Sequence, residues 1–196
     1  IPTQNGTRRV PLMPWEMQMG WDLATGKTGD RIIVLKSREI ASSTFWMQYA
    51  CKFVLANPGA NVVVAADKEG NASNLISYAR TIFNSLPVDC RPAIKKDNET
   101  TISFPKLGNQ IKALPGTVSA GRSERGKLLI CTEMAFVEKP EEYFQSVSGA
   151  LVEGSMIVIE STANTQADLF HDMWYDLENG YHKRFFGVWE NPSHTP

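Results

Sequence analysis

Three clusters of polar residues stand where short apolar runs end, and their side chains are of the kinds that bind phosphate, hold a metal ion or activate water. The clusters are residues 36–43, Thr132 with Glu133, and residues 160–164. Each follows four or five mostly apolar residues, the length of a buried strand in a parallel sheet. Because ligands bind at the carboxyl ends of such strands, we expect the clusters to lie at one edge of a sheet.

The first cluster has the setting of a phosphate-binding loop, because aromatic and apolar residues recur at helical spacing directly after it. The first turn of a helix has unpaired N–H groups and the positive end of the helix dipole, so it favours an anion. The residues predicted to bind the phosphates are Lys36, Ser37, Arg38, Glu39, Ile40, Ala41, Ser42, Ser43 and Thr44.

This loop departs from the usual pattern, G-x-x-x-x-G-K-[ST]. Lys36 and Ala41 stand in place of the two glycines, Ser42 stands in place of the lysine, and Ser43 alone fits, as the hydroxyl that would hold Mg²⁺. Lys36 and Arg38 could supply the missing positive charge from the other end of the loop. We therefore expect the loss of Lys36 to abolish hydrolysis and the loss of Ser42 to do little. The alternative is a polar turn whose serines only cap the helix.

The second cluster has the pattern of four apolar residues followed by an acid. In nucleotide hydrolases an aspartate there holds the water shell of Mg²⁺, and the glutamate after it polarises the attacking water. Thr132 stands in place of the aspartate, so it could hold the metal only through water, while Glu133 is in place as the catalytic base. The alternative for Glu133 is a solvated side chain at the end of a strand.

The third cluster is a turn of small polar side chains. Ser161, Thr162, Ala163 and Asn164 are candidates for coupling residues that sense the terminal phosphate, because hydroxyl and amide groups reorganise easily when it leaves. The alternative is that these residues cap the helix that follows. Both roles are compatible.

The elements that would position these clusters alternate between strand and helix, which predicts a mostly parallel α/β sheet flanked by helices. Helices are predicted within residues 11–22, after residue 44, and within residues 69–86, 140–151 and 167–177. Strands are predicted at residues 31–35, 62–66, 128–131, 156–159 and 184–189, and a β-hairpin insertion at residues 100–104 and 110–114. Trp15 on the first helix either packs in the core or stacks on an adenine ring.

Composition sets broad limits. The 196 residues are 42% hydrophobic and 21% charged, which is enough for one domain with a substantial core. There is no long apolar run and no signal peptide, so we expect no membrane partner. Three widely spaced cysteines predict buried thiols in a reducing compartment. The net charge is −1, but residues 91–127 carry eight Lys and Arg against three Asp and Glu, which predicts a local basic patch.

In this order, P-W-E, K-S-R-E-I-A-S-S-T, the hairpin, G-R-S-E-R-G, L-L-I-C-T-E-M-A-F and I-E-S-T-A-N-T resemble the ATPase half of the large terminase subunit of tailed phages. That family packages double-stranded DNA into a procapsid, and the resemblance covers about residues 11–189. It implies a P-loop NTPase fold of the ASCE, RecA-like class that hydrolyses ATP with Mg²⁺. By position it makes Glu133 the catalytic base and Arg122 or Arg125 an arginine finger. Trp15, Glu16 and Gln18 become contacts of the adenine.

The resemblance also implies partners and boundaries. The portal protein and the small terminase subunit would be partners, and the assembled motor a homo-oligomeric ring, with the isolated domain monomeric. The place of action would be the host cytoplasm, with transient docking on the procapsid. We expect residues 1–10 to be an arm, residues 11–190 the ATPase domain, and residues 191–196 the start of a linker to a nuclease domain that this chain lacks.

Departures from the family pattern leave other functions open. Ala41 replaces a glycine, Glu16 replaces a glutamine for which Gln18 could substitute, and Thr165 replaces the glycine after S-T-A-N. One alternative is a degenerate nucleotide-binding assembly subunit with little hydrolysis, and another is a helicase-like DNA translocase.

Overall fold

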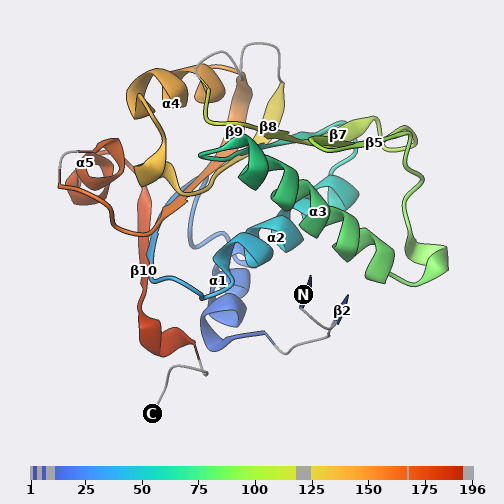
Figure 1. Ribbon diagram of the computed structural model, residues 1–196, viewed down its shortest axis with the longest axis horizontal. Coiled ribbons are helices and arrows are strands. Elements are labelled where there is room, and N and C mark those ends of the chain that lie inside the picture. Colours follow the sequence, from blue (N-terminus) through green and yellow to red (C-terminus); the bar gives the residue numbers. More distant parts are fainter. Residues whose placement is uncertain (1, 4–5, 8–11, 118–124, 167, 192–196) are drawn as a thin grey trace.

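The centre of the molecule is an eight-stranded sheet in the order β10-β3-β9-β8-β4-β7-β6-β5. A computed structural model describes residues 2–3, 6–7, 12–117, 125–166 and 168–191 (Figure 1). The strands from β10 to β7 run parallel, and β7, β6 and β5 run antiparallel. Their bounds are β3 Arg31–Lys36, β4 Asn61–Ala65, β5 Lys96–Asn98, β6 Thr101–Phe104, β7 Asn109–Leu114, β8 Gly126–Cys131, β9 Leu151–Ser161 and β10 His182–Phe186.

Helices cover both faces of the sheet (Figure 1). They are α1 Pro14–Ala24, α2 Ser42–Ala56, α3 Glu69–Ser85, α4 Pro140–Ser148 and α5 Leu169–Tyr175, with short 3₁₀ turns η1 Val88–Cys90, η2 Met134–Phe136 and η3 Val188–Glu190. A small ribbon of β1 Pro2–Thr3 and β2 Gly6–Thr7 precedes them, within the segment expected to be an arm. Within the described residues, every helix is too short or too polar to cross a bilayer.

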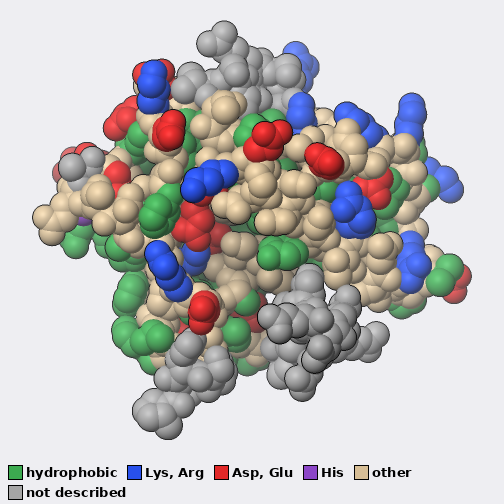
Figure 2. Space-filling model, in the orientation of Figure 1, with side chains coloured by type: hydrophobic (Ala, Val, Ile, Leu, Met, Phe, Trp, Pro, Cys, Tyr) green, Lys and Arg blue, Asp and Glu red, His purple; other side chains and the backbone are tan. Residues whose placement is uncertain are grey.

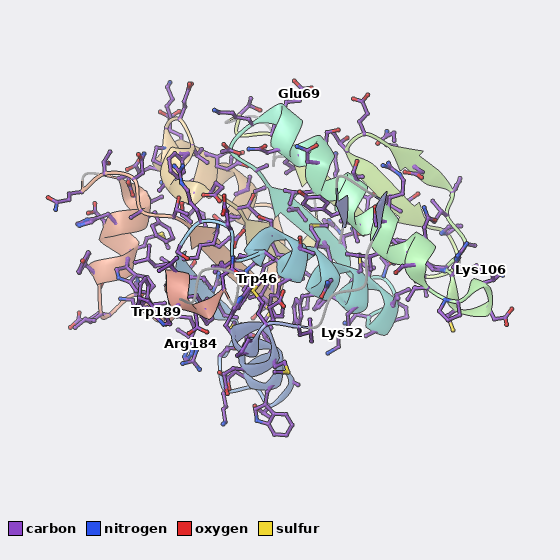
Figure 3. All side chains as sticks on the ribbon, turned by 60° about the horizontal axis from the view of Figure 1, so that its bottom comes forward. Trp46, Lys52, Glu69, Lys106, Arg184 and Trp189 are labelled. Atoms are coloured by element: carbon purple, nitrogen blue, oxygen red, sulfur yellow. The ribbon has the colours of Figure 1, made fainter. Side chains whose placement is uncertain are left out.

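Alternation along the strands builds two cores. Successive side chains of a strand point to opposite faces, so Ile32 and Val34 of β3 pack beneath α1, α2 and α3, whereas Ile33 packs beneath α4 and α5. Trp46 of α2 is fully buried in the first core, and Figure 3 labels it beside the sheet. Both cores are continuous with the carboxyl ends of the strands, so packing fixes the positions of the residues there.

The helix α1 packs against the start of α2 and against β10. The Trp15 ring lies 5.2 Å from that of Phe45 and 4.7 Å from that of Phe186 at the end of β10, measured between ring centroids. Arg184 of β10 forms an ion pair with Asp22 of α1, and Figure 3 shows its position. These contacts join α1, α2 and β10 into one block under the predicted phosphate loop.

The predicted hairpin is present, and the sheet extends one strand further. β5 was missed because its three residues are polar and exposed, without alternation. Arg80 of α3 holds this strand through Asp97, with 2.6 Å between Nη2 and Oδ1. Basic side chains gather at the right of Figure 2, the side of the hairpin. The exposed basic residues of the predicted patch include Arg91, Lys95, Lys96 and Lys106.

Several element boundaries and one burial prediction were wrong, and the strand predicted at residues 156–159 is the longer β9. The helix predicted at residues 140–151 ends at Ser148, because Leu151 already pairs with Gly126 and begins β9. The last strand ends at Phe186, and the residues after Gly187 turn into η3. The final helix is confined to Leu169–Tyr175, capped by Asp168, whose side chain accepts from the backbone N–H of His171 at 2.8 Å. Cys90 is exposed, whereas the other two cysteines are buried.

Gly116 allows a test of how closely the segment after β7 packs against the segment after β4. A Cβ at this position would lie 2.2 Å from the carbonyl oxygen of Asp67, at the end of β4. Gly116→Ala should therefore lower stability by about 1–3 kcal/mol, the cost of overpacking against backbone. Gly70→Ala is the matched control, because nothing lies within 4 Å of a Cβ there. It lies in the first turn of α3 and should gain up to ~1 kcal/mol. Chemical denaturation of both variants checks the pair, and equal stabilities would contradict the packing.

Candidate active site

The three polar clusters meet at the carboxyl ends of β3, β9 and β8. These strands are neighbours, with β9 between the other two, so the sheet brings residues about 30 to 120 positions apart to one edge. The expectation that the clusters come together is confirmed. What each side chain does there follows from its contacts.

Lys36 and Glu133 form the central ion pair of the site. Nζ of Lys36, the last residue of β3, lies 2.6 Å from Oε1 of Glu133, two residues beyond β8. The Lys36 side chain is only 7% exposed and that of Glu133 28%, so water screens the pair weakly. A charge-assisted hydrogen bond of this length is among the stronger polar contacts in proteins. The predicted phosphate ligand and the predicted base are therefore partners.

Glu133 has a constrained backbone. Its φ of 53° and ψ of 43° are in the left-handed region, which non-glycine residues rarely adopt. It precedes η2, and its carbonyl accepts from the N–H of Phe136 at 3.0 Å. The second carboxylate oxygen accepts from the N–H of Thr162 at 3.4 Å. Strain of this kind gathers at functional sites, where the surrounding structure holds a side chain in one direction.

Glu160 is a site residue whose role the sequence did not predict. It is fully buried, and its carboxylate accepts hydrogen bonds from the hydroxyl of Ser42 and from that of Ser43, the latter at 3.4 Å. Burial raises the pKa of the Glu160 carboxyl, and the positive charge of Lys36 opposes that rise. The sequence did contain a sign that Glu160 is buried. Val158 and Glu160 are two positions apart and therefore point to the same face of the sheet, toward α2.

Ser42 has a structural contact that the sequence did not predict, and the expectation that its loss does little to hydrolysis stays a prediction. Its side chain is 3% exposed and donates to the buried Glu160. Removing the hydroxyl leaves that carboxylate short of a donor, and an unsatisfied buried group costs about 1–3 kcal/mol. A loss of stability in a Ser42 variant therefore differs from a loss of phosphate binding.

The loop between β3 and α2 is held from the side of β10. The N–H of Ser37 donates to the carbonyl of Phe186 at 2.8 Å, and Nδ2 of Asn191 donates to the carbonyl of Glu39 at 2.8 Å. Ile40 is buried, while Arg38 is exposed. Glu39 and Ala41 both have φ near +60°, so the loop makes two left-handed turns before α2 begins at Ser42.

Two cavities flank Glu133. One, of about 290 Å³, has mixed charge and is lined by Lys36, Arg38, Glu39, Asp67, Glu133, Phe136 and Thr162. The other, of about 190 Å³, has mainly hydroxyl and amide groups and is lined by Ser43, Asn71, Asn74, Leu75, Tyr78, Thr132 and Glu133. Ser43 and Thr132, the two predicted metal-site residues, therefore lie together on one side of Glu133. Thr44 is buried behind them.

The predicted coupling residues are bound to the segment that follows Glu133. Ser161 Oγ accepts from the N–H of Ala135 at 3.1 Å, and Asn164 Nδ2 donates to the carbonyl of Ala135 at 2.8 Å. Thr162 faces the same cavity as Lys36, and Ala163 lines a separate cavity of about 250 Å³ beside α5. The capping alternative for this turn is not the arrangement observed, because Asp168 caps α5.

The predicted contacts of adenine have other partners. Trp15 is 2% exposed, and a stacked base needs an open ring face, so the structure contradicts that prediction. Glu16 accepts from the N–H of Met13 at 2.6 Å and caps α1, and burial raises the pKa of its carboxyl. Gln18 Nε2 donates to Asp22 at 2.9 Å. On this helix, Trp15 and Glu16 are buried in the protein and not exposed to a ligand.

One of the two candidate arginines, Arg125, is among the described residues. Arg122 lies outside the described residues. Arg125 is exposed at the start of β8, and its carbonyl accepts from Asn61 Nδ2 at 3.2 Å. Glu133 lies beyond the opposite end of that strand, roughly 25 Å away at ~3.3 Å per residue. Arg125 therefore cannot reach Glu133 within the same chain.

Hard oxygen ligands suited to Mg²⁺ are present at the start of α2. The hydroxyl of Ser43 is exposed to the cavity it shares with Glu133, and a carboxylate, Glu160, lies behind it. Mg²⁺ is commonly held by one or two protein oxygens together with substrate phosphates and water. Among the described residues, no group of three or more His, Cys, Asp and Glu is placed to hold a metal ion. The hydroxyl and the carboxylate thus fit a phosphate-linked Mg²⁺.

Ala41 allows a test of the loop geometry. At φ 57° and ψ 22° its Cβ is strained, by about 1–2 kcal/mol for a left-handed residue, and glycine relieves this at an entropic cost of about 0.4–1 kcal/mol. Ala41→Gly should therefore leave stability unchanged or raise it by up to ~1 kcal/mol. Ala50→Gly, in the interior of the same helix, should lose about 1 kcal/mol or more. Thermal unfolding compares the two, and an equal loss would contradict the left-handed turn.

Solved structures share the fold of this chain, although no protein-family model and no curated protein sequence matches it. The large terminase of a thermophilic bacteriophage, in complex with ATP-gamma-S, has a TM-score of 0.69 at 15% identity over 94% of this chain and 47% of that one. The ATPase domain of the Thermus phage P74-26 large terminase has a TM-score of 0.65 at 12% identity, over 95% of this chain and 85% of that one.

The SWI2/SNF2 ATPase core of Sulfolobus solfataricus, in complex with dsDNA, is a more distant match, with a TM-score of 0.52 at 14% identity over 84% of this chain and 34% of that one. This chain spans about half the length of the thermophilic-phage terminase that it matches. At these identities the likeness establishes the fold. The predicted fold class is therefore confirmed: the chain has the α/β fold of the ATPase domains of phage large terminases.

Proposed function

We propose that this chain is the ATP-hydrolysing motor domain of a viral terminase large subunit, which moves double-stranded DNA into a procapsid. The observation that carries the proposal is the ion pair of Lys36 and Glu133 beside the first turn of α2. The pair joins a lysine that would bind phosphate to a carboxylate that would polarise water. It lies in the fold that phage terminase ATPase domains share. Residues 11–190 would form the motor unit.

The phosphates of ATP would lie over the loop that precedes α2. The first N–H groups of a helix have no partner within the helix, and the dipole of this fifteen-residue helix favours an anion there. Lys36 and Arg38 line the adjoining cavity and add positive charge. Ser43 would hold Mg²⁺, which when bound neutralises charge that develops on the phosphate oxygens.

Glu133 would act when Lys36 changes partner. In the structure, Lys36 neutralises the Glu133 carboxylate at 2.6 Å. A phosphate in the cavity offers Lys36 a second anionic partner, and one carboxylate oxygen of Glu133 is then free to accept a hydrogen bond from water. The left-handed backbone of Glu133 fixes the direction in which that carboxylate points. Binding and catalysis would thus be linked by one lysine.

Movement at Glu133 would reach the rest of the domain through Ala135. Both backbone polar groups of Ala135 are bonded to the coupling residues Ser161 and Asn164. Thr162 faces the phosphate cavity and also contacts the second oxygen of Glu133. A change at the phosphate would therefore shift the turn that leads into α5.

Assembly would complete the motor. We infer a homo-oligomeric ring that contacts the portal protein and the small terminase subunit in the host cytoplasm. An arginine from a neighbouring subunit would complete the site, and Arg125 can act only in that way. The basic surface around the β5–β7 hairpin is the candidate contact for the DNA backbone, because Lys and Arg neutralise phosphates.

Two other functions have specific support. Ser42 and Thr132, in place of lysine and aspartate, favour a nucleotide-binding assembly subunit that hydrolyses little. The likeness to the SWI2/SNF2 core favours a helicase-like translocase. Stimulation of hydrolysis by DNA separates the motor from the assembly subunit. Dependence of DNA movement on a portal and procapsid, without strand separation, separates packaging from helicase-like action.

Glu133→Gln tests the chemistry. If Glu133 polarises water, the variant should bind ATP nearly as the wild type does and hydrolyse it roughly 10²–10³-fold more slowly, since one transition-state contact is lost. Single-turnover hydrolysis with and without double-stranded DNA, together with nucleotide titration, measures both effects. Glu141→Gln, an exposed residue on α4, is the matched control and should behave as wild type. Unchanged hydrolysis in Glu133→Gln would move the proposal to the assembly subunit.

Mixed subunits test the arginines. An arginine acting on a neighbour's terminal phosphate is worth about 10³–10⁵ in rate. Subunits carrying Arg122→Ala or Arg125→Ala, mixed in the assembled motor with Glu133→Gln subunits, should regain activity that neither variant has alone. The regain arises where an intact Glu133 meets an intact arginine from the neighbour. Absence of complementation for both residues would rule out an arginine supplied in trans from this loop.

A further inference from the structure

A carboxylate is missing from the end of β8. Thr132 occupies the position from which an acid would hold the water shell of Mg²⁺, and its hydroxyl points to the carbonyl of Ala65 at 3.5 Å. Its N–H donates to the same carbonyl at 2.8 Å, so Thr132 is tied to β4. Glu133 is engaged with Lys36. The metal-site hydroxyl of Ser43 therefore needs its acidic partner from another strand.

We propose that Glu160 supplies this carboxylate from the neighbouring strand β9. The inference rests on the proposed ATPase function. Among the described residues, Glu160 is the acid that contacts Ser43, whose Oγ donates to it at 3.4 Å, and it also accepts from Ser42. It is fully buried, so its position is set by packing. It acts through Ser43 and is therefore a positioning residue.

The register of the sheet explains how a carboxylate on β9 can take the place of one on β8. Cys131 of β8 pairs with Ile159 of β9, so the next residues along, Thr132 and Glu160, lie at the same level on adjacent strands. They follow Ile130 and Val158 by two positions and point to the same face, toward α2. Neighbouring strands are about 4.8 Å apart. Glutamate is one methylene longer than aspartate, and β9 adjoins β3, so Glu160 lies directly beneath the serines.

The other nearby acid does not have these contacts. Asp67, beyond the end of β4, accepts from Asn71 Nδ2 at 2.5 Å. It lines the cavity of Lys36 and Thr162, whereas Ser43 lines the cavity on the other side of Glu133. Asp67 therefore does not have the contacts that would let it act through Ser43.

Glu160 would orient the hydroxyl that holds the metal. By accepting the Ser43 proton, the carboxylate turns the oxygen lone pairs of Ser43 toward the cavity, and its charge favours a cation there. Partners that orient a metal ligand in this way typically change metal affinity by about 10–100-fold when they are removed.

The experiment measures the effect of Mg²⁺ on the affinity for a fluorescent ADP analogue. Each protein is titrated with the analogue in Mg²⁺ and in EDTA, and the ratio of the two dissociation constants is compared. Glu160→Gln should reduce that ratio about 10–100-fold and leave the affinity in EDTA within about twofold of wild type. Glu141→Gln, at an exposed acid of α4 outside both cavities, is the control and should leave the ratio unchanged. An unchanged ratio in Glu160→Gln, or equal losses of affinity in Mg²⁺ and in EDTA, would overturn the inference.

A rescue variant separates positioning from general structural damage. Thr132→Asp returns the acid to β8, so Thr132→Asp combined with Glu160→Gln should recover much of the Mg²⁺ effect. Ser43→Ala should lose the effect as Glu160→Gln does, and combining the two should cost little more, because both act through one contact. If Glu160→Gln fails to fold by circular dichroism, an unchanged Mg²⁺ effect in Ser43→Ala overturns the inference. A wild type that binds no nucleotide in either condition would instead overturn the proposed function.

Discussion

The ion pair between Lys36 and Glu133 is the contact on which the organisation of the site depends. It joins the ends of β3 and β8 across the strand between them, and it is largely removed from water. A buried cation without a partner is strongly unfavourable, so Lys36, which is 7% exposed, needs the carboxylate of Glu133 when no ligand is present. An anion that binds Lys36 competes with Glu133 for the same three N–H donors. The pair therefore stabilises the empty site and also relates ligand binding to the freedom of the carboxylate.

Backbone strain is concentrated around this pair. Among the described non-glycine residues, positive φ angles occur at Glu39, Ala41, Glu133 and Lys139. Three of these border the site, and each costs of order 1–3 kcal/mol. Hydrogen bonds from Asn191 to the carbonyl of Glu39, and around Ala135 beside Glu133, oppose relaxation. The strain persists because both cores lie directly beneath these turns.

The sequence predicted those parts of the fold that depend on apolar patterning. Short apolar runs located β3, β4 and β8, and the polar residues after β3 and β8 marked the two halves of the ion pair. β5 was missed because the charges of an exposed edge strand carry no alternation. Trp15 was ambiguous because an aromatic residue at helical spacing fits a core or a ligand equally well. Packing against Phe45 and Phe186 resolved it in favour of the core.

Glu160 shows why a site is harder to predict than a sheet. A polar residue at a strand end is expected to face solvent. Because side chains alternate along a strand, only the number of residues that separates it from a core residue shows on which face of the sheet it lies. Val158 and Glu160 share a face with Val34, so a carboxylate at that position must lie under α2, whatever loop follows. Its burial then requires donors, and Ser42 and Ser43 provide them from the first turn of that helix. A lysine at position 42 would place a long charged side chain where the buried acid needs a short hydroxyl donor. The unusual serine of the loop and the buried acid of β9 therefore explain each other, and neither can be interpreted from its own segment of the sequence.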